Sequence, residues 1–193
     1  NVIIKNSVFQ NNHSEDALNL VQVKGNLENI TIQNTPSDGL DIDFGEVLIS
    51  HSEFLNIGEA TGADAIDMSQ SNVKIDNVNI SNVTDKGVSI GEGSIAKISN
   101  LFISSAFVGI VAKDSSDVSA QDIILEDIIF ADTMSYRKKP QFNGANLRIE
   151  NLNTTLGNHI TQNMSTTSIN GRRIKPKDVD IDVLYNNVMK SNK

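Results

Sequence analysis

Residues 27–44 read LENITIQNTPSDGLDIDF, and most of the chain repeats this stretch at intervals of 22 to 26 residues. The first half recurs as ISHSEFLN (49–56), IDNVNISN (75–82), ISNLFISS (98–105) and AQDIILED (120–127), and the second half as EDALNLV (15–21), ADAIDMS (63–69), DKGVSIGE (85–92) and FVGIVAK (107–113). Apolar and polar residues alternate within each half, which is typical of β-strands. Repeats of this length built from short strands predict a parallel solenoid with one coil per repeat.

The register of the repeat is set by two columns of mostly Asn residues. One column contains Asn6, Asn29, His51, Asn77, Asn100, Asp122 and Asn151, and the other contains Asn11, Asn34, Asn56, Asn82, Ser105 and Asp127. Up to Asp122 and Asp127, the steps along both columns are 23, 22, 26, 23 and 22 residues. Equivalent positions in a parallel solenoid stack at about 4.8 Å, so buried Asn side chains can hydrogen-bond to those above and below them. We therefore expect both columns to be structural asparagine ladders.

The composition argues against several classes of function. The 193 residues suffice for one domain with a substantial core, the net charge is −8, and there is no Cys. Without Cys the chain has neither disulfides nor thiolate chemistry. The acidic balance argues against nucleic acid and anionic membranes as partners, because both need clustered Lys and Arg. It is compatible with divalent cations, and no segment reaches the roughly 18 apolar residues of a membrane span.

The repeat predicts an all-β chain in two parts. Residues 1–174 are expected to form a single-stranded parallel β-helix of about seven to eight coils, with roughly 22 residues per coil. Residues 175–193 are expected to form a C-terminal cap or tail with a short helix, with Asp178 as its N-cap. In that cap, Val179, Val183 and Leu184 would cover the open end of the core. The N-terminus shows no comparable cap, so we expect an upstream segment or domain to be joined there.

Three aspartates of the repeat are candidates for a functional site. The alternation in DGLDIDF predicts that Leu40, Ile42 and Phe44 point into the core and that Asp41 and Asp43 point outward. In the next coil the equivalent outward residue is Asp67, about 5 Å from Asp41 after stacking. Like charges at this separation are unfavourable unless they are hydrated, screened or bridged by a cation.

Three interpretations of this acidic patch remain open. In the first, the aspartates before the small residues are turn residues bonded to the backbone, and the outward ones are solvated. In the second, Asp41, Asp43 and Asp67 bind Ca²⁺, which prefers six to eight oxygen ligands. In the third, Asp41 and Asp67 are an acid/base pair that cleaves a glycosidic bond.

The repeat resembles the right-handed parallel β-helix proteins of the pectate-lyase-like superfamily over residues 1–174, and the expected right-handedness rests on this resemblance. Four stretches are similar to motifs of the polygalacturonase-like hydrolases: TPSDGLDID (35–43), GADAID (62–67), DKGVSIGEGS (85–94) and RRIK (172–175). The family's second motif has two Asp residues where this chain has only Asp64, and Lys86 occupies the position of the family's His.

The resemblance also bears on mechanism. Related lyases pair Ca²⁺ with a Lys or Arg base that removes a proton beside a uronate carboxylate, and this implies Lys86 as a candidate base. The alternative is that Lys86 forms only an ion pair with Asp64 or Asp85.

Three functions follow as hypotheses. The first is a secreted or cell-surface module that binds or displays polysaccharide. The second is a β-helix enzyme, either a Ca²⁺-dependent uronate lyase or a glycoside hydrolase, with Asp41, Asp67 and Lys86 as catalytic residues. The third is a structural spacer in an adhesin or filament.

Overall fold

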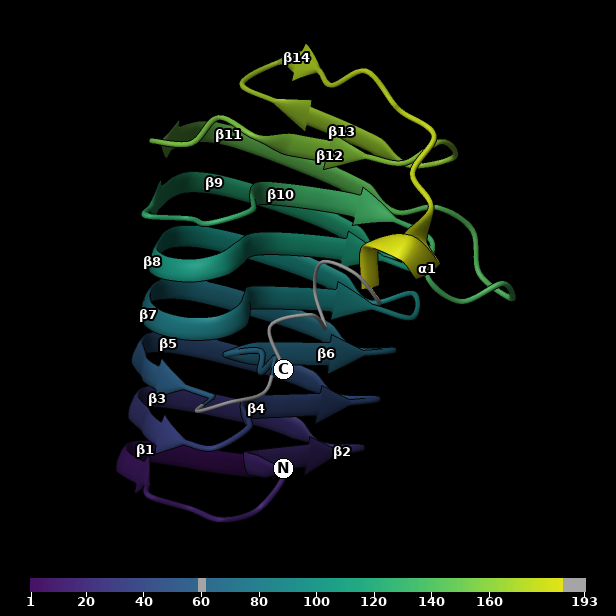
Figure 1. The fold of residues 1–193 in the computed structure, drawn as a ribbon. Coiled ribbons are helices and arrows are strands. Elements are labelled where there is room, and N and C mark those ends of the chain that lie inside the picture. The colour runs from purple at the N-terminus through teal and green to yellow at the C-terminus, as the bar shows by residue number, and fades with distance from the viewer. Residues whose placement is uncertain (59–61, 186–193) are drawn as a thin grey trace.

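In the computed structural model of the protein, the chain winds into a stack of coils (Figure 1). Residues 1–58 and 62–185 are described by the structure. Over these residues the protein is a parallel β-solenoid of about seven turns, with about 23 residues per turn. The predicted all-β, single-stranded parallel β-helix is therefore confirmed, as is the approximate length of its repeat.

The strands form two stacks that share long members. The first stack comprises β1 (Val2–Gln10), β3 (Lys24–Thr35), β5 (Glu46–Ile57), β7 (Asn72–Gly91), β8 (Ile95–Lys113), β9 (Asp117–Glu126), β11 (Asn146–Thr154), β13 (Thr166–Ile169) and β14 (Arg172–Arg173). The second comprises β2 (Asp16–Val21), β4 (Asp38–Asp43), β6 (Ile66–Ser69), the later halves of β7 and β8, β10 (Ala131–Tyr136) and β12 (His159–Thr161). All pairings between these strands are parallel except β13 with β14.

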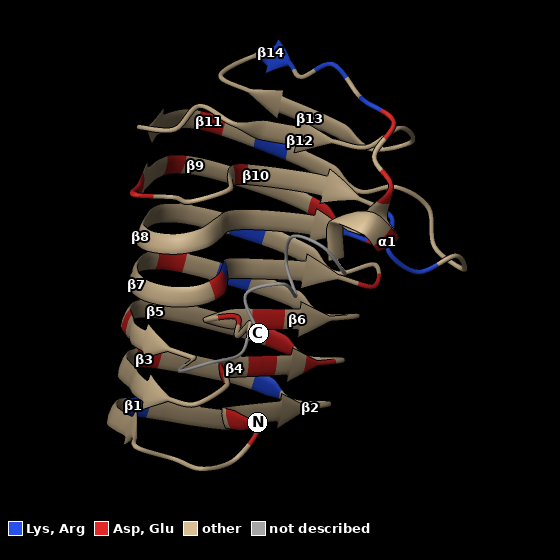
Figure 2. Cartoon of the chain, viewed as in Figure 1, with Lys and Arg blue, Asp and Glu red and all other residues tan. Residues whose placement is uncertain are grey.

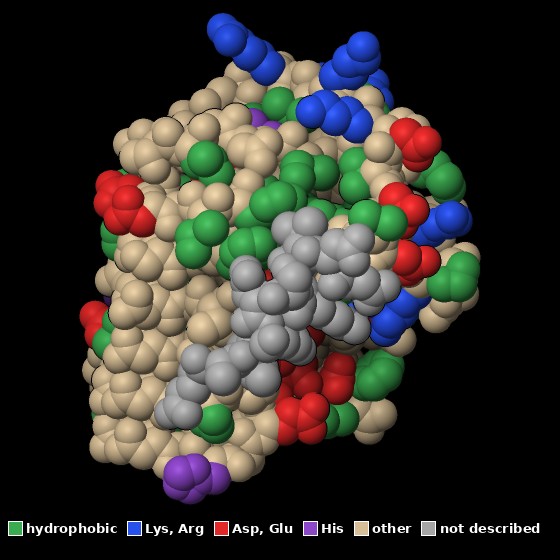
Figure 3. Space-filling model, viewed as in Figure 1, with side chains coloured by type: hydrophobic (Ala, Val, Ile, Leu, Met, Phe, Trp, Pro, Cys, Tyr) green, Lys and Arg blue, Asp and Glu red, His purple; other side chains and the backbone are tan. Residues whose placement is uncertain are grey.

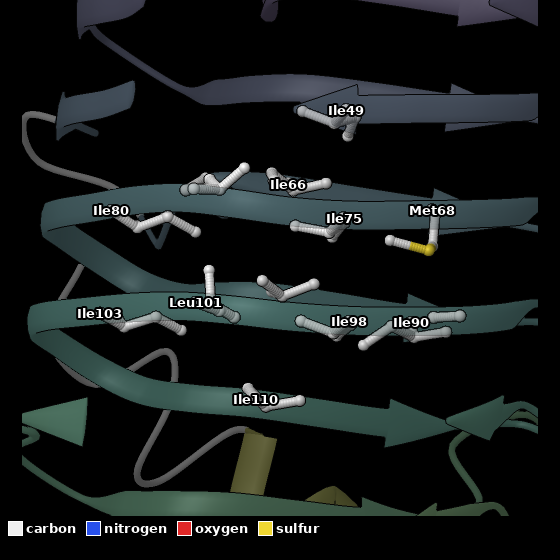
Figure 4. Close-up of a cluster of buried hydrophobic side chains, with 14 of the residues drawn as sticks. Ile49, Ile66, Met68, Ile75, Ile80, Ile90, Ile98, Leu101, Ile103 and Ile110 are labelled. Atoms are coloured by element: carbon white, nitrogen blue, oxygen red, sulfur yellow. The ribbon is translucent and has the colours of Figure 1, made fainter. Parts of the chain in front are cut away.

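The core is a column of aliphatic side chains between the stacks (Figure 4). Ile49 pairs in register with Ile75, and Ile75 pairs with Ile98, so one residue type repeats up the core. Leu40 and Ile42 are fully buried, as the alternation predicts. Burying each such side chain stabilises the fold by roughly 1.5–3 kcal/mol, which explains why most inward positions are Ile, Leu or Val.

Both polar columns lie at corners of the coil where the backbone is left-handed. Asn29 and Asn34 have φ values of 53° and 54°, and every other member of the two columns also has a positive φ. Asn is one of the few residues that adopts this conformation readily. Asn56 donates to Asn34 Oδ1 at 2.9 Å and accepts from Asn82 Nδ2 at 3.0 Å. These side chains are exposed rather than buried, so backbone conformation explains the columns better than core ladders do.

A third left-handed corner was not predicted. It contains Gln22, Phe44, Gln70, Glu92 and Asp114. Phe44 has a φ of 55° and is 51% exposed, so the expectation that it points into the core is wrong. The left-handed turn after β4 ends the alternation one residue early and directs this ring outward. The column contains no Asn, which is why the sequence pattern does not reveal it.

The C-terminal segment covers a flank of the solenoid. The helix α1 (Ile181–Leu184) begins at Asp180, whose side chain accepts from Val183 N, so the expected N-cap Asp178 is wrong. Ile181 and Leu184 are buried in a cluster with outward-facing apolar residues of β8 and β10. Val183 is half exposed, whereas Val179 packs against this cluster.

The last coil of the solenoid ends in a short antiparallel return of the chain, which was not predicted from the sequence. The chain turns back after β13, and β14 pairs with it in antiparallel fashion. Residues 186–193 of the expected cap lie outside the described residues. Within the described part of the chain, no helix is long and apolar enough to cross a membrane.

Candidate functional site

The outward face of the second stack carries a row of polar side chains. Asn19 on β2, Asp41 on β4, Asp67 on β6 and Ser89 on β7 are in register, each one coil from the next. The predicted stacking of Asp41 on Asp67 is therefore confirmed. Together with Asp38, Asp43 and Asp64, the two aspartates form what we call the acidic strip. Figure 2 shows the acidic positions of β4 and β6 in red along the ribbon, and Figure 3 shows acidic side chains gathered on this part of the surface.

Asp41 is the half-buried centre of the strip. Its Oδ2 accepts a hydrogen bond from Asn19 Nδ2 at 3.2 Å. Burial, together with the nearby charges of Asp43 and Asp67, raises the pKa of Asp41 to about 7. Burial and Asp67 also raise the pKa of Asp43. Asp41 therefore carries a proton for a large fraction of the time near neutral pH, unlike an ordinary aspartate.

Asp67 has the opposite electrostatic balance. Burial acts to raise its pKa, but Lys113 and further partners outweigh burial, and the net pKa is lowered. Lys113 Nζ lies 3.6 Å from Asp67 Oδ1 and donates to Ser89 Oγ at 2.9 Å. Met68 N donates to the same Asp67 oxygen at 3.0 Å. Asp67 is thus held as a carboxylate beside a neighbour that tends to be protonated.

Gly91 makes room for the Lys113 side chain. A Cβ atom at Gly91 would lie only 2.6 Å from Lys113 Cε. Because that space is open, the lysine extends across β7 and reaches a carboxylate on β6. The close approach of this side chain is a physical reason for Gly at position 91.

Lys86 is enclosed by two carboxylates. Its Nζ lies 2.6 Å from Asp85 Oδ2 and 3.0 Å from Asp64 Oδ1, and its side chain is 5% exposed. Burial acts to lower the pKa of Lys86, but Asp64 and Asp85 outweigh it and the pKa is raised. A protonated ammonium that donates to two carboxylates has no free electron pair to accept a proton. The geometry therefore favours the ion-pair interpretation of Lys86 over the role of a base.

Asp38 and Asp64, which precede the small residues Gly39 and Ala65, are bonded to the backbone, as the first interpretation of the acidic patch predicts. Asp38 Oδ1 accepts from Asp64 N at 2.8 Å, and Asp64 Oδ1 accepts from Lys86 N at 3.1 Å. Each carboxylate thus bonds to the backbone of the coil above, which ties successive coils together. Burial and the charge of Asp64 raise the pKa of Asp38 to about 7.

The strip does not fit a Ca²⁺ ion in this arrangement. Within residues 1–58 and 62–185, no three His, Asp or Glu side chains gather closely enough to hold a metal ion. Asp41, Asp43 and Asp67 share one face, but Asp67 is turned to Lys113, whose charge already offsets its own. Ca²⁺ needs six to eight converging oxygens, so we assign no step to a metal.

Basic and aromatic side chains lie beside one end of the acidic strip. Tyr136 and Tyr185 are joined by a hydrogen bond of 2.6 Å between their hydroxyls, and Lys138 Nζ lies 4.4 Å from the centre of the Tyr185 ring. Lys139 pairs with Glu92 at 2.6 Å, and Glu92 also accepts from Ser69 Oγ. The repeat pattern does not reveal these contacts, because Glu92 and Tyr185 belong to neither Asn column.

The last stretch that resembles a hydrolase motif lies elsewhere. Arg172 and Arg173 of RRIK form β14 at the end of the solenoid and are exposed. They therefore contribute no side chain to the acidic strip, which is built on β4 and β6.

Comparison with known proteins bears on the fold. A family model described as right handed beta helix region matches residues 16–187. No curated protein and no solved structure matches the chain. The match covers most of the chain and agrees with the coil-on-coil register of its strands, and the chain therefore belongs to the right-handed β-helix family.

Proposed function

We propose that the protein is a secreted or cell-surface β-helix module that binds polysaccharide along the acidic strip. The observation that carries this proposal is the straight row of Asn19, Asp41 and Asp67, one on each of three successive coils, which the buried Ser89 continues on the next coil. A row of polar groups repeated about every 4.8 Å along a rigid sheet suits a linear ligand with repeating hydroxyl groups. Because the strands hold the row in place, little ordering is required on binding.

The chemistry of the row suits sugars in particular. The half-protonated Asp41 can both donate and accept hydrogen bonds, whereas the ionised Asp67 only accepts. Asn19, at the end of the row, supplies its amide oxygen as an acceptor, because its Nδ2 already donates to Asp16 and Asp41. Sugar hydroxyls are donors and acceptors at once, so such a mixed row can satisfy them.

The test is a binding survey of soluble glycans with matched variants. The double variant Asn19→Ala/Asp41→Ala removes two members of the row but retains the Asp67–Lys113 pair. We expect it to bind the best neutral glycan about tenfold more weakly than the wild type. Glu53→Ala removes an exposed carboxylate from β5 and should bind normally. The proposal fails if the wild type binds no glycan, or if the double variant binds as tightly as the wild type.

A glycoside hydrolase is the second candidate, supported by the divergent pKa values of Asp41 and Asp67. Neighbouring carboxyl groups with pKa values pushed apart are the arrangement that supplies one acid and one carboxylate. Asp41 would donate its proton to the departing glycosidic oxygen, and Asp67 would attack the sugar or accept a proton from water. The lyase alternative lacks this support, because Lys86 is protonated and paired.

Hydrolysis can be separated from binding. Asp41→Asn preserves the shape of the side chain but cannot supply the proton. An enzyme should release new reducing ends, and this variant should lose the release while it continues to bind. Binding without any release by the wild type would leave only the first proposal. If neither binding nor cleavage is found, the spacer hypothesis gains.

A further inference from the structure

We infer that a second face of the solenoid, on the outside of the first stack, binds a linear anionic polysaccharide. This face carries a column of four basic side chains, which we call the basic groove: Lys74 on β7, Lys97 on β8, Arg148 on β11 and Arg173 on β14. It is built from other residues than the acidic strip and stands or falls separately from the function proposed for the strip.

The register places these cations in one straight line. Lys74 pairs with Lys97, and Lys97 pairs with Ser119. Ser119 pairs with Arg148, which continues through Ser168 to Arg173. Five steps of about 4.8 Å give a line roughly 24 Å long, parallel to the axis of the solenoid.

The line runs through three adjoining cavities. The first, of about 540 Å³, is lined by Lys74 and Lys97. The second, of about 510 Å³, is lined by these two residues together with Ser119 and Arg148. The third, of about 640 Å³, is lined by Ser119, Arg148 and Arg173. Because neighbouring cavities share lining residues, they form one continuous groove along the coils.

Within residues 1–58 and 62–185, none of the four cations of the groove forms an ion pair with a carboxylate, although Lys74 acts, after Lys24, to lower the pKa of the nearby Glu46 carboxyl. Lys5, Lys24, Lys86, Lys113 and Lys139 all form ion pairs with carboxylates. In the part of the chain that the structure describes, no carboxylate oxygen lies within 4 Å of a cationic nitrogen of Lys74, Lys97, Arg148 or Arg173. Like charges on directly paired strand positions, such as Lys74 and Lys97, are unfavourable. A bound anion would relieve this repulsion, which is the physical case for a ligand.

The residues beside the line indicate what kind of polyanion fits. Asp76 and Glu150 flank the column on one side, and Glu46 and Asp117 flank it on the other. A nucleic-acid duplex, with one charge per roughly 1.7 Å of axis, would place phosphates against these carboxylates. A glycan carries fewer charges and many hydroxyl groups. These hydroxyls can donate hydrogen bonds to the carboxylates and can form hydrogen bonds with the nearby side-chain amides of Gln121 and Asn146. The mixed lining therefore favours a sparsely charged sugar chain.

The experiment measures binding of defined polymers to the full chain. The probes are hyaluronan fragments, with one carboxylate per disaccharide, chondroitin sulfate, which adds sulfate, neutral dextran, and single-stranded DNA of similar length. We expect the wild type to bind at least one of the two anionic glycans, with an affinity that falls as salt rises. The glycan that binds more tightly shows whether carboxylate or sulfate is the preferred group.

The key variant is Lys97→Gln/Arg148→Gln, which should bind the anionic glycan about tenfold more weakly. Lys5→Gln/Lys177→Gln changes the net charge equally at exposed positions outside the groove and should bind like the wild type. Circular dichroism confirms that both variants are folded, and Asn19→Ala/Asp41→Ala should bind these probes normally. The inference is overturned if neither anionic glycan binds, if the control pair weakens binding as much, or if Lys97→Gln/Arg148→Gln weakens the binding of dextran or DNA as much as that of the anionic glycan.

Discussion

Lys113 on β8 and Asp67 on β6 form an ion pair across the strand that separates them, with 3.6 Å between Nζ and Oδ1. The later half of β7 lies between the two strands, and its Gly91 leaves space for the lysine side chain. This pair keeps Asp67 ionised while Asp41, one coil away, tends to hold a proton. The electrostatic asymmetry of the strip thus depends on a lysine two coils from it.

Removing that lysine should destabilise the protein. Lys113→Met leaves Asp67 partly buried without its cation, and we expect a loss of about 2 kcal/mol in the free energy of unfolding, discounted because Asp67 is about a quarter exposed. Chemical denaturation measures the loss. Lys97→Met, at an exposed and unpaired position, should change stability by less than about 0.5 kcal/mol.

Gly91→Ala offers a second test that deletes neither charge. The added methyl should displace the Lys113 side chain and raise the pKa of Asp67, which an NMR titration of its carboxyl carbon follows. An unchanged pKa would contradict the role that we assign to the open space at Gly91.

The stability of the protein should depend on pH through Asp41. The pKa of this group is about 7 in the folded chain and near 3.9 when unfolded. Between these values the folded chain binds more protons than the unfolded chain, so the free energy of unfolding should fall as pH rises from about 4 to about 7. Asp38, with the same raised pKa, contributes in the same direction.

The measurement compares wild type with Asp41→Asn between pH 5 and 8. His159, whose pKa is lowered by burial, acts in the opposite direction in this window but is common to both proteins. The variant should lose less stability on going to pH 8, by about 1 kcal/mol after solvent screening of a half-exposed group. Glu53→Gln should follow the wild-type curve, and identical curves for Asp41→Asn would count against the raised pKa.

Calcium should not stabilise the protein specifically. Because no set of three carboxylates converges within the described residues, millimolar CaCl₂ should shift the melting temperature no more than MgCl₂ at equal ionic strength. A Ca²⁺-specific rise that disappears in Asp41→Asn/Asp67→Asn would reverse this expectation and restore the metal interpretation of the strip.

Phe44 offers a stabilising substitution. Its backbone is left-handed and its ring is half exposed, so it carries conformational strain with little burial in return. Phe44→Asn should raise the free energy of unfolding by about 1 kcal/mol, because Asn tolerates this conformation better. Phe102→Asn, a change of the same type inside β8, lacks this rationale and should not stabilise. A less stable Phe44→Asn variant would mean that the ring makes contacts that outweigh the strain.

The fold and the register of the acidic strip follow from the sequence for a definite reason. Strand alternation is a local property of the sequence. The two Asn columns have the same residue intervals from coil to coil, which determines which residues stack, so the pairing of Asp41 with Asp67 follows from their positions in the repeat. The prediction that Phe44 points inward was wrong, because strand alternation does not reveal that a left-handed turn falls at this residue. The ion pairs of Lys86 agree with one of the two roles that the sequence leaves open for this residue.

The contacts that tune the strip could not be predicted in the same way. Lys113 reaches Asp67 only through a gap above Gly91, and Tyr185 reaches Tyr136 from 49 positions away along the chain. Such contacts depend on side-chain direction and on where the C-terminal segment docks. The apolar pattern of that segment fits either the open end or the flank, and only the cluster beside β8 and β10 decides between them.

The antiparallel return of β14 has a consequence for assembly. A parallel solenoid whose last coil remained open would present a full row of unpaired backbone groups, onto which another molecule could stack end to end. Here β14, which consists of the two cationic residues Arg172 and Arg173, pairs in antiparallel fashion with Ser168 and Ile169 of β13. An antiparallel edge strand cannot continue the parallel register of the coils, so this end of the rod is a poor template for stacking a further parallel coil of another molecule.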